Sequence, residues 1–330
     1  MDREQEQMQF LGLFGIFKES YKTIISWRKI FTQITLTLIL PLTFIFLAQI
    51  EISNLLVQDI EHTEFEKEDT QRFTKRYDNL SDKISSEWTT FILFKVVYIV
   101  VFLILSLLST AAVVYTIASV YTGRELTFKK VMSVVPKVWK KLIVTFLCKF
   151  TAFFIYNFFA ILFMFICEFL VPYPFGTILF FVVLVMYVVG SLYMIVCWQL
   201  ASVVSVLESS YGFSAMAKSN NLIKGNKMVA ITILFLLSLS FILINILFEL
   251  HVVHGSLEVW KRVGLGALCF ILLLIANLFE LVIHTILYLV CKSYHHENID
   301  KGDLSNHLES YLGEYTPLSG KDIQLEQYQV

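Results

Sequence analysis

Among the ionisable residues inside, or at the edge of, long apolar stretches, four lie toward the same predicted side: Lys149, Glu208, Glu280 and His284. An ionisable group in an apolar environment costs several kcal/mol unless it is paired or hydrated. Glu280 and His284 are four residues apart, so they project from one face of a helix. We predict that these residues line a polar cavity, with Lys149 as the counter-charge. The alternative is that the charges only pair with one another and have a structural role.

Other residues with chemical potential form weaker patterns. His251 and His254 share a helical face beside Glu249, and two histidines with a carboxylate are able to bind a metal. The stretch lacks the spacing of a zinc protease motif, however, and no phosphate-binding loop, GxSxG elbow or CxxC pair occurs in the sequence. We therefore predict no catalytic residue, no bound metal and no cofactor.

The elements that must position these residues follow from composition. Of the 330 residues, 57% are hydrophobic and 16% are charged, whereas a soluble domain carries about 25% charge. Runs of about 20 apolar residues are long enough to cross a bilayer. Six such runs occur: Ile30–Ile50, Phe91–Val120, Leu142–Val171, Thr177–Leu207, Met228–Leu250 and Val263–Cys291. The predicted fold is an all-α polytopic membrane bundle of six transmembrane helices, spanning residues 30–291.

Positive charge beside the spans predicts the orientation. Lys and Arg number 14 on the side that holds both termini and seven on the opposite side, so both termini are predicted to be cytosolic. Residues 51–89 then form a lumenal loop, solvated and open to helical extensions, and Asn79 in the sequon Asn79-Leu80-Ser81 becomes a candidate glycosylation site. Residues 292–330 are predicted to be an acidic, flexible cytosolic tail.

Three cytosolic segments have an amphipathic pattern. They are Phe10–Ile25, Phe128–Trp139 and Phe213–Ile223, and the first belongs to a cytosolic N-terminal segment, residues 1–29. Such segments are either interfacial helices that bind anionic head groups or elbows that start the next span. The net charge of −1 excludes a nucleic acid as a general partner. The predicted partners are membrane lipids, with other membrane proteins as further candidates.

A weak internal repeat relates two of the spans. Ala111–Tyr121 aligns with Ala201–Tyr211, with identical residues at five positions of the alignment. Each copy ends a span that leads into a basic connector and a returning span. The pattern indicates a parallel repeat of two hairpins or a coincidence among common residues.

Several segments carry a resemblance to known families. They are Phe10–Phe31, Ser106–Gly123 with Val135-Pro136-Lys137, and Trp198–Glu208 with its continuation to Gly225. Over nearly the whole chain, they resemble a plant family of uncharacterised six-span transmembrane proteins. Residues Glu208 to Gly225 are distantly similar to the membrane domain found with bacterial glycerophosphodiester phosphodiesterases. The phosphodiester-cleaving chemistry of those enzymes belongs to a separate soluble domain, which this sequence does not contain.

Three classes of function remain open. The first is a non-enzymatic integral membrane protein with a lipid-interacting, membrane-organising or scaffolding role. The second is a transporter or permease that uses a cytosol-facing intramembrane cavity lined by Lys149, Glu208, Glu280 and His284. The third is a membrane-embedded lipid-modifying enzyme. The predicted location is the endoplasmic reticulum or another secretory-pathway membrane, with the plasma membrane as the alternative.

Overall fold

In a computed structural model, residues 11–70, 72–123, 126–170, 172, 175–255 and 258–295 are described, and every regular element in these ranges is helical. The longer helices are α2 (Leu13–Ser26), α4 (Leu40–Glu68), α5 (Lys75–Tyr121), α6 (Phe128–Leu170), α7 (Phe175–Trp198), α9 (Phe213–Ile223), α10 (Lys227–Phe248) and α11 (Val259–Tyr294). The shorter ones are α3 (Arg28–Ile34), α8 (Ala201–Leu207) and the π-helical turns η1 (Thr35–Ile39) and η2 (Glu249–Val253).

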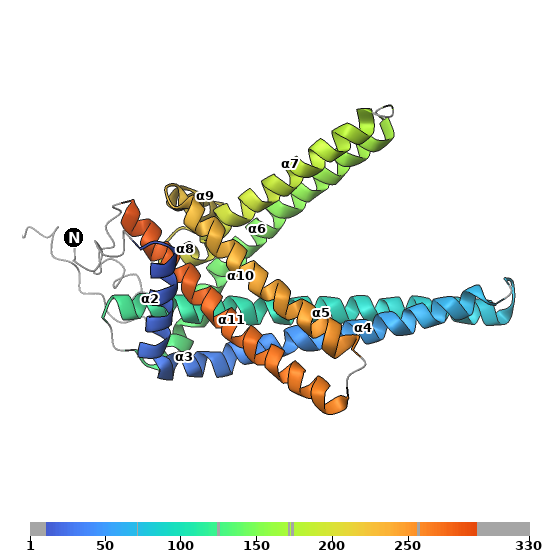
Figure 1. Ribbon diagram of the computed structural model, residues 1–330, viewed down its shortest axis with the longest axis horizontal. Coiled ribbons are helices and arrows are strands. Elements are labelled where there is room, and N and C mark those ends of the chain that lie inside the picture. The colour runs from blue at the N-terminus through green and yellow to red at the C-terminus, as the bar shows by residue number, and fades with distance from the viewer. Residues whose placement is uncertain are drawn as a thin grey trace, which may run out of the picture.

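Six helical stretches in the described ranges are long and apolar enough to cross a membrane, in agreement with the six predicted runs. They pair into three hairpins, α4–α5, α6–α7 and α10–α11, which fan out from a common end (Figure 1). Helices α2, α8 and α9, which are too short to cross a bilayer, gather at that end, which we call the short-helix end. The three hairpin turns lie at the opposite end.

The best-buried part of the molecule lies toward the short-helix end. Residues 111–119 of α5, residues 203–207 of α8 and residues 285–291 of α11 are almost continuously buried. Two of these segments fall in the two halves of the predicted repeat, so the repeated sequence contributes the core. Much of the apolar surface of α6, α7 and α10 is exposed, and no residue in the most apolar stretch of α7 is buried.

Residues 51–89 differ from the predicted loop. Helix α4 continues to Glu68 and helix α5 begins at Lys75, so only a short turn separates them. Thr74 caps α5 by accepting a hydrogen bond from the backbone N–H of Tyr77. Ile60 and Leu80 are buried in this extension. A loop was predicted because the segment is polar, but two adjoining polar helices need only a narrow apolar seam.

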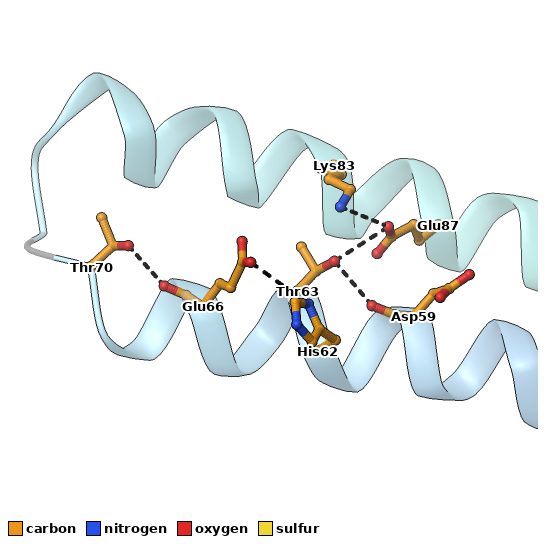
Figure 2. Close-up of polar contacts among 7 residues, drawn as sticks. All are labelled: Asp59, His62, Thr63, Glu66, Thr70, Lys83 and Glu87. Carbon is orange, nitrogen blue, oxygen red and sulfur yellow. Dashed lines mark hydrogen bonds and ion pairs between the residues drawn. The ribbon is translucent and has the colours of Figure 1, made fainter.

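Polar contacts support the extension along its length (Figure 2). Between the helices, Thr63 Oγ1 lies 3.3 Å from an oxygen of Glu87. Within them, Lys83 and Glu87 form an i,i+4 ion pair at 3.5 Å, and His62 lies 3.7 Å from Glu66. Asn79 is exposed on helix α5 rather than on a loop.

The amphipathic segments have mixed outcomes. Helix α2 agrees with the helix predicted at Phe10–Ile25, and α9 has the bounds predicted for Phe213–Ile223. The segment Phe128–Trp139 is not a separate helix, because α6 runs through Pro136 without a break. Residues 1–10 and the predicted flexible tail from residue 296 onward lie outside the described residues.

Candidate functional site

Helix α11 presents Glu280 and His284 to one cavity, as their spacing predicts. The cavity has a volume of about 190 Å3. Its polar walls come from α5, from α11 and from the break between α7 and α8. The lining residues are Leu42, Ser106, Ser109, Thr110, Val114, Gln199, Ser202, Val203, Asn277, Glu280, Leu281 and His284. We call this space the polar cavity.

Among the described residues, Glu280 is the only acidic one that lines the polar cavity. Within the described ranges, no residue forms a hydrogen bond or an ion pair with its carboxyl group. An acid inside a bundle of apolar helices normally has a partner, because the unpaired charge is costly. Glu280 is therefore available to a group that enters the cavity.

His284 is held by a residue that sequence reasoning missed. Gln199 lies between the end of α7 and the start of α8, and its Nε2 is 2.7 Å from His284 Nε2. With the amide in this orientation, Gln199 donates and His284 accepts, so the neutral ring carries its proton on Nδ1. The other amide atom, Gln199 Oε1, is buried and has no hydrogen-bond partner among the described residues. The signal that could have identified Gln199 from the sequence was its position as a single glutamine within an apolar run.

Lys149 does not pair with Glu280 in the part of the chain that the structure describes. Its Nζ donates a hydrogen bond of 2.9 Å to Ser202 Oγ, which lines the polar cavity. Lys149 thus lies behind Ser202, near the His284 end of the cavity. Its role as a counter-charge for the cavity stays a prediction.

Glu208 belongs to a separate cluster near the short-helix end. One carboxylate oxygen accepts hydrogen bonds from Tyr288 Oη at 2.6 Å and Lys292 Nζ at 3.1 Å, and the other lies 2.7 Å from Lys218 Nζ. These contacts join the end of α8 to α9 and α11. We call this group the Glu208 cluster. The sequence did not identify Tyr288 and Lys292 as partners of Glu208, because they are 80 and 84 residues away.

The electrostatics of the Glu208 cluster favour an ionised carboxylate. Burial acts to raise the pKa of Glu208. The hydrogen bonds from Lys218 and Tyr288, with the positive charges of Lys292 and Lys218, outweigh that effect, and the pKa lies below its usual value. The cluster is closed on itself, and Glu208 does not line the polar cavity.

An apolar cavity adjoins the polar one. Its volume is about 230 Å3, and it is lined by Leu42, Phe46, Phe102, Phe241, Leu273, Asn277 and Glu280. Leu42, Asn277 and Glu280 line both cavities. The carboxyl group of Glu280 therefore lies where a polar space meets an apolar one, an arrangement that suits an amphipathic ligand.

The histidines near the end of α10 form no comparable site. His251 and His254 are both exposed, and His254 lies at the end of the π-helical turn η2. His254 Nδ1 is 3.2 Å from the backbone oxygen of Glu249. Within the described residues, no three His, Cys, Asp or Glu side chains group as metal ligands.

The described residues form an all-α fold in which six helices are long and apolar enough to cross a membrane. A family model described as Domain of unknown function (DUF8558) matches residues 1–328. The chain belongs to that family. Comparison with curated proteins and with solved structures gives no match.

Proposed function

We propose that the protein is an integral membrane protein with six transmembrane spans and cytosolic termini, in a secretory-pathway membrane or the plasma membrane. The apolar faces of α5, α6, α7 and α10 support insertion. Side chains such as Phe154, Phe181 and Phe235 are more than half exposed, and a soluble protein rarely exposes contiguous apolar surface of this extent. The basic short-helix end supports the cytosolic orientation. The resemblances to the plant family and to the bacterial membrane domain stay predictions.

We further propose that the protein is not an enzyme and that it binds a membrane lipid. The observation that carries this proposal is the unpartnered carboxyl of Glu280 at the junction of the polar and apolar cavities. The lipid head group occupies the polar cavity, and part of an acyl chain lies against Phe102 and Phe241 in the apolar cavity. Phenylalanine walls favour hydrocarbon, while hydroxyl and amide walls favour a head group.

The test is the lipid that accompanies the purified protein. Phe241→Trp places a larger ring in the apolar cavity and is expected to reduce the lipid bound per protein, measured by native mass spectrometry. Leu239→Trp is the matched control, because Leu239 lies two residues away on α10 and is exposed. Equal lipid retention by both variants would contradict the proposal.

The second candidate function is a permease. It is favoured by one observation, which is that Glu280 and His284 lie one helical turn apart on the wall of the same polar cavity. Two titratable groups at this spacing are suited to relay a proton with a solute. Uptake into liposomes that depends on a pH gradient, and is abolished by Glu280→Gln, would favour the permease over the lipid-binding protein.

A further inference from the structure

The polar groups that line the polar cavity are left with more hydrogen-bond acceptors than donors. Ser109 donates to the backbone oxygen of Leu105 at 2.7 Å, and Thr110 donates to that of Ser106 at 2.9 Å. A hydroxyl has one hydrogen and two lone pairs, so these two oxygens are left as acceptors. The hydroxyls of Ser106 and Ser202 are able to act either way, and Ser202 already accepts from Lys149.

The amide groups have the same bias. Asn277 Nδ2 donates to the backbone oxygen of Leu273 at 2.9 Å and to Thr43 Oγ1 at 3.3 Å. Both of its hydrogens are thereby engaged, and its oxygen is left to accept. Gln199 Nε2 donates to His284, while Gln199 Oε1 is buried without a partner. A buried acceptor without a donor is costly, so a ligand that donates to it stabilises the site.

The charges near the cavity indicate where a donor binds. The acid on the wall is Glu280, His284 is neutral when it accepts from Gln199 Nε2, and the Lys149 ammonium lies behind Ser202 at the His284 end. A cation is therefore attracted to the Glu280 end and repelled from the Lys149 end. A primary ammonium group supplies three N–H donors and a positively charged partner for the Glu280 carboxyl group.

We propose that the head group bound in the polar cavity is a primary ammonium, held by Glu280 with Asn277 as a neutral acceptor. This inference rests on the proposed function, since it names the class of lipid that the joined cavities bind. Glu280 and Asn277 line both cavities, so the ammonium sits where the hydrocarbon part of the same molecule enters the apolar cavity. The primary ammonium is the feature shared by amine phospholipids, sphingoid bases and small free amines.

The experiment compares head groups on one chain pair. The purified full chain in nanodiscs is offered phosphatidylethanolamine, phosphatidylcholine or phosphatidylglycerol with identical acyl chains. The wild type is expected to prefer phosphatidylethanolamine by about tenfold, the ratio that one charge-assisted hydrogen bond produces. Phosphatidylcholine carries the same charge without N–H donors, so it separates donation from charge alone.

Variants separate the possible outcomes. Glu280→Gln is expected to bind lipid without the head-group preference, while Glu258→Gln, an exposed change near the start of the same helix, keeps the preference. Lipid binding with equal affinity for the three head groups overturns the ammonium inference and leaves the proposed function standing. If free ethanolamine displaces the bound lipid at the same concentration at which the lipid itself binds, the result supports recognition of the ammonium group and overturns the proposal that the ligand is a lipid. An absence of bound lipid in the wild type overturns both.

Discussion

Glu208 and Glu280 are two acids of similar sequence setting that have opposite surroundings. Glu208 accepts hydrogen bonds or ion pairs from three side chains, and its own side chain is 11% exposed. Glu280 lines two cavities and, within the described residues, has no such partner. An apolar sequence around an acid therefore does not identify a ligand site. The inventory of partners separates an acid that holds the protein together from one that is available to a ligand.

The Glu208 cluster lies where the chain turns sharply. Glu208 follows the end of α8, and Gly212 adopts a positive φ of 64° before α9 begins. The Gly212 N–H donates to Thr145 Oγ1 at 2.8 Å, and that oxygen is 2.7 Å from Ser205 Oγ. The turn between α8 and α9 is thus tied to α6 by hydroxyls and to α11 by the Glu208 carboxylate. These ties support a structural role for Glu208.

The largest expected effect is that of Glu208→Gln. It leaves Lys218 and Lys292 near each other without their anion, and breaking a buried pair in this way costs about 3 kcal/mol. The free energy of unfolding in detergent measures it. Glu258→Gln is the control, because its pair with Lys261 is exposed on both sides and contributes about 0.5 kcal/mol. Equal effects of the two variants would refute the structural role of Glu208.

Acid is expected to remove the same contribution. The pKa of Glu208 in the folded protein lies below the ordinary 4.5, so the unfolded chain binds the proton more tightly than the folded one. The stability that this carboxylate contributes is full above about pH 4.5 and is lost as the pH falls through the lower, folded-state value. Unfolding measured from pH 7 downward should show the wild type converging on Glu208→Gln in acid. A gap between them that stays constant down to pH 2 would contradict this linkage.

Tyr288→Phe is expected to have an intermediate effect. The change removes the hydrogen bond of 2.6 Å to the Glu208 carboxylate and the one of 3.3 Å that Tyr288 Oη accepts from Lys292, and it keeps the buried ring. The expected cost is about 1.5 kcal/mol. The control is Tyr294→Phe, since Tyr294 lies on the same helix and is exposed. A larger loss of thermal stability in Tyr294→Phe than in Tyr288→Phe would indicate that Tyr288 acts through packing alone.

Glu280→Gln is expected to give the smallest change in stability, and one of opposite sign. Replacement of an unpaired acid by a neutral isostere in lipid-free protein should raise the free energy of unfolding by about 1 kcal/mol or less. The comparison with Glu208→Gln is direct, because both variants make the same chemical change. A loss as large as that of Glu208→Gln would show that Glu280 has a structural partner.

The sequence was sufficient to predict the six apolar helices and one pair of residues in the polar cavity, Glu280 and His284. Six runs of apolar residues are sufficient to predict six long helices, and the spacing of Glu280 and His284 predicts a shared face. The extension of α4 and α5 was left open rather than predicted, because its stability comes from contacts between two polar helices, such as Thr63 with Glu87. Hydropathy does not record such contacts.

The assignment of partners was the other limit. Lys149, Glu208, Glu280 and His284 were predicted as one group. The structure places Glu280 and His284 on the polar cavity, Lys149 behind its wall on Ser202, and Glu208 in the Glu208 cluster. The division depends on which helix faces which, and Gln199 reaches His284 across 85 residues of sequence. No local pattern encodes a contact over that distance.

The most direct test of the central claim is to map where a lipid sits. A photoactivatable phosphatidylethanolamine in nanodiscs should label cavity residues such as Phe102 and Phe241, and Phe241→Trp should suppress the labelling of Phe102. Labelling confined to outward-facing residues such as Phe154 and Val185, with the cavity residues unlabelled, would contradict the account.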